Sequence, residues 1–177
     1  MPALRVRVAR PCRFLGTDRF QILGVARAEI VYFADVRDGR LERAFHAQFE
    51  HFLEHTEYTY NYSMPHTVRL GQHEYMYDTH VFNAAAEARE NPDSDSAHKH
   101  VWLTGMGYAS FEWTASTRFV RLLDETRRHE VLLIYGEALD DAEAEALCAA
   151  GRESRQWRQM EDALHARALE TFSIIEG

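Results

Sequence analysis

Runs of β-branched and aromatic residues, separated by turn-forming residues, constrain the fold of this chain more than any other feature. The longest run, FQILGVARAEIVYFADV at 20–36, suits one bent strand or two strands that meet near Gly24. An earlier half-buried strand is indicated where Leu4, Val6 and Val8 alternate with arginines. TVRLGQHEYMYDTHVFN, with a break at Gly71, and HEVLLIYGEAL predict further strands. These segments together predict an antiparallel meander.

Two regions favour helices instead. After a turn at VRDGR, where Asp38 suits an N-cap, apolar residues recur at helical spacing and predict a helix over about 40–55: Leu41, Phe45, Phe49, Phe52 and Leu53. A second helical region, about 140–172, begins at Asp140 and can be divided at Gly151. We therefore expect one α+β domain over residues 1–177, with a mostly antiparallel sheet packed against the 40–55 helix and the C-terminal helices.

Two segments are less well determined by their patterns. NAAAEARENPDSDSAHK predicts a helical stub and then a mobile polar loop at about 90–98, with strand resuming at HVWLT. Residues 117–128 suit either a helix or a strand, and this choice decides whether the sheet is purely antiparallel or mixed.

Composition restricts the class of protein. A net charge of −8 disfavours nucleic acid as a partner, because phosphate binding needs clustered lysines and arginines. The N-terminal residues have no apolar core typical of a signal peptide, and no segment reaches the length of a membrane span. The two cysteines, Cys12 and Cys148, are far apart, which is typical of a reducing compartment. We expect a cytoplasmic protein with no membrane partner.

The predicted 40–55 helix contains HFLEH at 51–55, an H-x-x-E-H motif. On a helix, His51 and His55 would project from one face at a spacing that can bind one Zn²⁺. The motif resembles that of the pitrilysin-type inverzincin peptidases. The resemblance implies a zinc-dependent hydrolase in which His51 and His55 bind the metal and Glu54 is the general base. Glu125 or Glu130 would supply the missing ligand. The alternative is that both histidines lie on the surface of a helix that packs on the core.

Five of the eight tyrosines fall within twenty residues, and the period-two pattern of TEYTYNYS predicts that three of them share a strand face. If this segment pairs with the strand that follows, an aromatic sheet face results, suited to a small apolar molecule or a protein partner. The candidate ligand-binding residues are Tyr58, Tyr60, Tyr62, Tyr75 and Tyr77. Plain cross-strand packing is the alternative.

Other polar groups are weaker candidates. In a strand, Glu74, Asp78 and His80 would share one face, so that Asp78 could orient His80, and His98 and His100 would likewise be neighbours. Apolar residues near the C-terminus can serve either the core or a homodimer contact: Trp157, Phe172 and Ile174. Two functions remain open: a non-catalytic binding domain that uses the tyrosine-rich face, and the zinc hydrolase.

Overall fold

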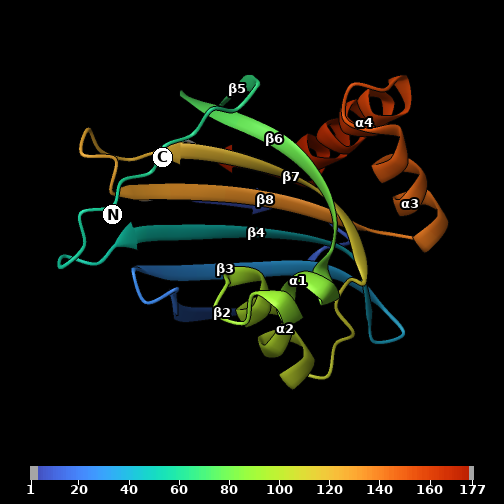
Figure 1. Cartoon of the computed structure of the whole chain (residues 1–177), viewed down its shortest axis with the longest axis horizontal. Helices are drawn as coiled ribbons and strands as arrows, with labels where there is room; N and C mark the ends of the chain where they lie inside the picture. The colour runs from blue at the N-terminus through green and yellow to red at the C-terminus, as the bar shows by residue number, and fades with distance from the viewer. Residues whose placement is uncertain (1–3, 176–177) are drawn as a thin grey trace.

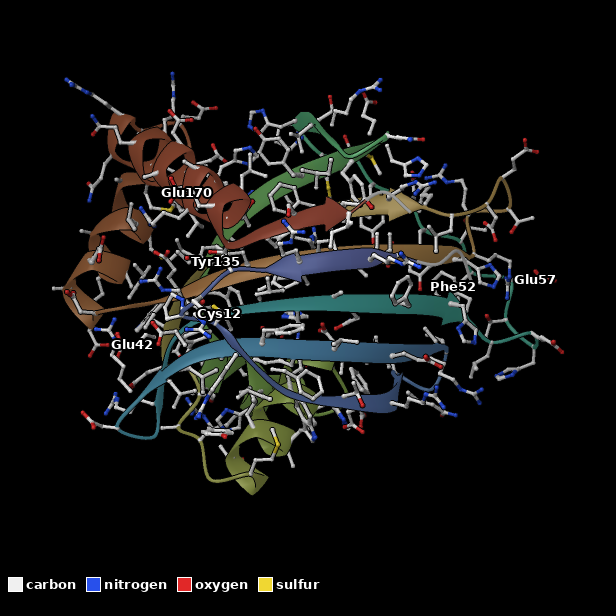
Figure 2. All side chains as sticks on the ribbon, turned by 180° about the vertical axis from the view of Figure 1, so that it is seen from behind. Cys12, Glu42, Phe52, Glu57, Tyr135 and Glu170 are labelled. Carbon is white, nitrogen blue, oxygen red and sulfur yellow. The ribbon has the colours of Figure 1, made fainter. Side chains whose placement is uncertain are left out.

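The computed structural model describes residues 4–175 and has an α+β fold built on two antiparallel sheets. The main sheet has seven strands in the order β2-β3-β4-β8-β7-β6-β5. Their bounds are β2 Arg13–Ile22, β3 Ala26–Arg37, β4 Arg40–Phe52, β5 His66–Leu70, β6 His73–Asn83, β7 Trp113–Leu122 and β8 His129–Leu139. Two short strands, β1 (Arg5–Val8) and β9 (Phe172–Ile175), pair with each other and cross the back of the main sheet (Figure 2).

The helices divide between the two faces of the main sheet. The helices α1 (Ala84–Glu90) and α2 (Asp95–Gly105) lie on one face, where α2 packs over β2, β3 and β4 (Figure 1). The helices α3 (Asp141–Ala150) and α4 (Arg155–Thr171) follow β8, and α4 packs with β1 and β9 on the opposite face. The sheet thus has a core on each side: Leu103 of α2 is buried in one, and Leu164 of α4 is buried in the other.

The prediction of a helix over about 40–55 is wrong. This segment forms β4, a central strand that pairs with β3 on one side and β8 on the other. Apolar residues spaced by four satisfy a period of two as well as a period of 3.6, so the pattern did not distinguish the two structures. The segment is a strand because it pairs with β3 along one edge and with β8 along the other, and such tertiary contacts override helix propensity. Asp38 is accordingly a turn residue with φ 50°, beside Gly39 with φ 77°.

Several other predictions are confirmed. The 20–36 run forms two strands that meet at a turn with Gly24 at φ 68°, and Gly71 separates β5 from β6. Asp140 caps α3, and Gly151 ends that helix before α4 begins, which confirms the divided helical region at about 140–172. Residues 113–122 are strand and every pair of strands named above is antiparallel, so the open alternative of a mixed sheet is settled.

Two further expectations need correction. The polar loop placed at about 90–98 is a short turn at 91–94, because Ser94 caps α2, which already begins at Asp95. The segment that begins at HVWLT is therefore helix up to Gly105 and not strand. Residues 56–63 form no strand and belong to a loop, 53–65, that joins β4 to β5. Within residues 4–175 no helix is long and apolar enough to cross a membrane.

Candidate functional site

A groove lies between the main sheet and the helices α1 and α2. It consists of two adjoining cavities, a wide arm of about 480 Å³ and a narrow arm of about 90 Å³. The linings of the two arms share five residues: Phe82, Ser96, Lys99, Ser116 and Ile134. A pocket of this size, with an apolar floor and a few polar groups, is typical of a small-molecule site.

Strand alternation explains why polar side chains reach the groove. Successive residues of a strand point to opposite faces, and on β4 the even-numbered His46 and Glu50 line the groove while Phe45 is buried in the opposite core. On β8, Glu130, Leu132 and Ile134 line the groove in the same way. The floor is therefore acidic at one end of β8 and apolar toward the other.

A pair of carboxyl groups lies at the acidic end of the groove. Glu50 and Glu130 are directly opposite each other in the pairing of β4 with β8. Such cross-strand neighbours have Cβ atoms about 5 Å apart. Glu50 accepts hydrogen bonds from Gln48 Nε2 at 2.5 Å and from the Tyr60 hydroxyl at 3.3 Å. Glu130 Oε1 accepts one from the Tyr62 hydroxyl at 2.9 Å, but Glu130 Oε2 is buried without a partner.

The surroundings of Glu50 and Glu130 favour a state in which the two carboxyl groups together hold one proton. Burial, and then the charge of Glu50, raise the pKa of Glu130 to about 8. Burial also raises the pKa of Glu50, although its hydrogen bonds with Gln48 and Tyr60 act in the opposite direction. Both oxygens of Glu50 accept hydrogen bonds, which stabilises its carboxylate form. The proton of the pair is therefore bound to Glu130. At neutral pH the pair therefore holds one proton, and this proton lies at the lining of the groove, where it can interact with a bound molecule.

The two cations of the wide arm are already paired with other carboxylates. Lys99 Nζ donates to Asp95 Oδ2 at 2.9 Å. Arg118 forms a bidentate ion pair with Asp78, in which Nε donates to Oδ1 at 3.1 Å and Nη2 donates to Oδ2 at 2.9 Å. Burial alone would raise the pKa of each aspartate, but Lys99 lowers that of Asp95, and His80 and Arg118 lower that of Asp78, to about 2 in each case. Among residues 4–175, the structure gives neither Glu50 nor Glu130 an ion pair.

A buried histidine, His46, lines the narrow arm beside Lys99. His46 stacks on the ring of Tyr32, with centroids 5.1 Å apart, and its Nε2 lies 3.3 Å from Lys99 Nζ. Burial, and then the charge of Lys99, hold the pKa of His46 well below its usual range. His46 is therefore neutral and can accept a hydrogen bond from Lys99.

The loop at 53–65 contributes Tyr60 and Tyr62 to the wide arm and is held by arginines of the β7–β8 turn. Arg128 donates to the carbonyl oxygens of Leu53 and Tyr58, at 2.8 Å and 3.0 Å. The Tyr60 amide donates to the Arg127 carbonyl at 2.8 Å. These contacts position the hydroxyl groups of Tyr60 and Tyr62 over the carboxyl pair.

The five tyrosines do not share one face. Tyr60 and Tyr62 line the groove from the loop, and Tyr58 on the same loop is 59% exposed. Tyr75 and Tyr77 lie on β6 and pack in the core beneath α4, on the other side of the sheet. The predicted aromatic sheet face is therefore not formed, and two of its members belong to the groove for a different reason, their hydrogen bonds to Glu50 and Glu130.

The H-x-x-E-H motif has no helical geometry in this structure. His51 lies near the end of β4 and points away from the groove, whereas Glu54 and His55 are exposed in the loop that follows. His51 instead faces His129 across β4 and β8, with ring centroids 5.7 Å apart. Over the described range 4–175, no three side chains of the ligating types are arranged to hold a metal ion. The helical premise of the zinc hypothesis is thus wrong.

The remaining candidates have local partners. Asp78 and His80 share a face as expected, with His80 Nε2 and Asp78 Oδ2 2.9 Å apart, while Glu74 is exposed. His98 and His100 lie on α2 and not on a strand. His98 pairs with Asp18 at 2.7 Å, and His100 lies 2.6 Å from the Ser110 hydroxyl.

The sequence did contain a signal for the residues that were missed. In AFHAQFEHF at 44–52, polar or charged residues alternate with apolar ones, so His46, Gln48 and Glu50 fall on one face of a strand. Glu130 interrupts the buried strand HEVLLIY, and Lys99 and Arg118 carry no local pattern. Only the pairing of β4 with β8 brings Glu50 and Glu130 together.

Comparisons with protein families, with curated proteins and with solved structures found no match for this chain.

Proposed function

We propose that this protein binds a small organic molecule in the groove, in contact with the Glu50–Glu130 pair. The observation that carries the proposal is the pair itself: a fully buried and a partly buried carboxyl group, without a cation of their own, line a cavity of about 480 Å³. Burying ionisable groups in this way is costly, so perturbed pairs in clefts are candidates for function.

The rest of the groove supports binding by a molecule with polar and apolar parts. The wide arm carries the carboxyl pair and the hydroxyl groups of Tyr60 and Tyr62. The narrow arm is lined mainly by apolar groups, among them Ala44, Leu103 and Phe111. A cavity of about 150 Å³ can hold benzene, so the narrow arm, at about 90 Å³, suits a smaller group such as a short alkyl chain.

The test is a fragment screen followed by protein NMR. Fragments of negative, zero and positive charge are added to ¹⁵N-labelled protein, and we expect binders to shift amide signals along the groove, at Glu50, Lys99, Ser116 and Ile134. Ser116 lines both arms, so Ser116→Phe should fill the groove and abolish these shifts.

The matched control is Ser173→Phe, which introduces the same ring at an exposed position of β9. Its shifts should equal those of the unmodified protein. Circular dichroism checks that both variants are folded, and Ser96→Phe on α2 replaces Ser116→Phe if that variant is not. Fragments that bind only outside the groove, or bind equally well to the filled variant, would refute the proposal.

A further inference from the structure

We infer that the ligand of the groove is an organic ammonium ion, whose charged nitrogen lies between Glu50 and Glu130 and whose apolar chain follows β8 toward the narrow arm. This inference rests on the proposed function and names the chemical class of its ligand.

The cations that lie near the pair are bound to other carboxylates. Arg118 and Lys99 face it from β7 and α2, but their hydrogen bonds go to Asp78 and Asp95. The other titratable groups that line the wide arm are His80 on β6, Glu87 on α1, and the two tyrosines of the loop. Against the effect of burial, Lys99 lowers the pKa of Glu50 and Arg118 lowers that of Glu130. Because each cation is hydrogen-bonded to an aspartate, however, the two charges of a fully ionised pair are offset only in part.

One oxygen atom of the pair has no hydrogen-bond donor in the described part of the chain. Glu130 lines the wide arm and is 1% exposed, and its Oε2 receives no hydrogen bond from a donor among residues 4–175. Once the pair has released its proton, Glu130 Oε2 is a hydrogen-bond acceptor, and an ammonium group carries three N–H donors and no acceptor. A carboxylate ligand would instead bring a further negative charge beside Glu50, where both nearby cations are already paired with other carboxylates.

The apolar floor of the groove runs along β8 away from the pair. From Glu130, the next groove-facing residues of β8 are Leu132 and Ile134, and Gly136 lines the narrow arm. A strand advances about 3.4 Å per residue, so Ile134 lies roughly 13 Å along β8 from Glu130. An extended chain advances about 1.2 Å per bond. The eight bonds of octylamine therefore span about 10 Å, from the pair past Leu132 toward Ile134 and the narrow arm.

Binding is linked to the release of a proton. The ammonium ion takes the place of the proton that the pair holds, so both groups become carboxylates when it binds. An alkylammonium ion has a pKa near that of lysine, about 10.4, and stays charged throughout the range in which the pair titrates. Affinity for an amine should consequently rise with pH up to the pKa of the pair.

The experiment is isothermal titration calorimetry of the full chain with n-alkylamines from butylamine to octylamine, with octanol and octanoate as neutral and anionic matches. We expect octylamine to bind at least tenfold more tightly than either match at pH 8. Its affinity should fall about tenfold for each pH unit below 8. Each added methylene should tighten binding by up to about fourfold. Buffers of different protonation enthalpy should show proton release at pH 7.

Two variants identify the acidic residues involved. Glu130→Gln should weaken octylamine binding at least tenfold at pH 8 and remove its dependence on pH. Glu29→Gln makes the same chemical change on β3, at a residue that pairs with Arg19 and does not line the groove, and should change affinity less than twofold.

The outcomes separate this inference from the proposed function. If octanol or octanoate binds in the groove as tightly as octylamine, or amine binding does not depend on pH, the ammonium assignment is wrong and the groove remains a binding site. If neither these compounds nor the fragment screen shifts a groove signal, both are wrong.

Discussion

The Tyr62 hydroxyl donates a hydrogen bond of 2.9 Å to Glu130 Oε1, which joins the 53–65 loop to the centre of the main sheet. The two residues are 68 positions apart in the sequence. The bond favours the ionised form of Glu130 and so opposes the effects of burial and of Glu50 on its pKa.

Tyr62→Phe should therefore raise the pKa of Glu130 further, by about 0.7 if the bond contributes about 1 kcal/mol. The measurement is a titration of the Glu130 carboxyl carbon by ¹³C NMR. Tyr58→Phe is the control, because that side chain is exposed and lines neither arm of the groove. An unchanged titration in Tyr62→Phe would mean that the loop does not tune the pair.

Glu130→Gln should change how stability depends on pH. The folded protein keeps the proton of Glu130 up to a pH of about 8, whereas the unfolded chain loses it near the ordinary value of 4.5. The unfolded state thus binds fewer protons between these values, and the free energy of unfolding falls as pH rises, by at most about 1.4 kcal/mol per unit. The glutamine side chain of the variant does not titrate, so the variant should lose this slope and be more stable than the unmodified protein at pH 8. Urea unfolding from pH 5 to pH 9 measures the difference, with Glu29→Gln as the reference.

Lys99→Met should destabilise the protein and raise the pKa values of Asp95 and His46. The substitution leaves Asp95 without its ion pair, so its pKa should rise from about 2, and the pKa of His46 should rise because a nearby positive charge is lost. We expect a loss of about 1–3 kcal/mol at pH 7, since the Asp95 side chain is still 32% exposed. Because the pKa of Asp95 is lowered in the folded state, its contribution is present above pH 4 and is lost as the pH falls toward 2. Chemical unfolding across this range tests the prediction.

The control for this variant is Lys99→Arg, which keeps the charge. It should retain most of the stability and leave His46 neutral at pH 6, as seen in its ring-proton NMR signals. Equal stability of the methionine and arginine variants would show that the pair with Asp95 contributes little.

Arg128→Ala should loosen the 53–65 loop without unfolding the sheet. The variant removes the two hydrogen bonds to Leu53 and Tyr58, and local stability depends on such contacts. Amide hydrogen exchange should become at least about fivefold faster in the loop and stay unchanged in β8. Arg127→Ala removes one exposed side-chain bond to Asn61 and should have a smaller effect. Uniformly faster exchange over the whole sheet would contradict the local role of Arg128.

The sequence predicted those elements whose signals are local. Gly24 and Gly71 mark turns with positive φ, and Asp140 and Gly151 bound α3, so these boundaries could be predicted from single residues. The error at 40–55 arose because a spacing of four fits both helix and strand, and only the partners β3 and β8 decide between them. The candidate site depends on the same partners. Glu50 and Glu130 become neighbours through strand order, which no short window of sequence contains.

The place of β8 between β4 and β7 has a consequence for folding. The meander of β2, β3 and β4 can pair from local contacts, but the free edge of β4 stays open until β8 inserts from some eighty residues further along the chain. Contacts of such high sequence separation are slow to form, and an open strand edge can pair with another chain while it waits. Assembly of the carboxyl pair and closure of the sheet are therefore one event, and a chain that has not yet acquired its acidic site is also one that is exposed to aggregation.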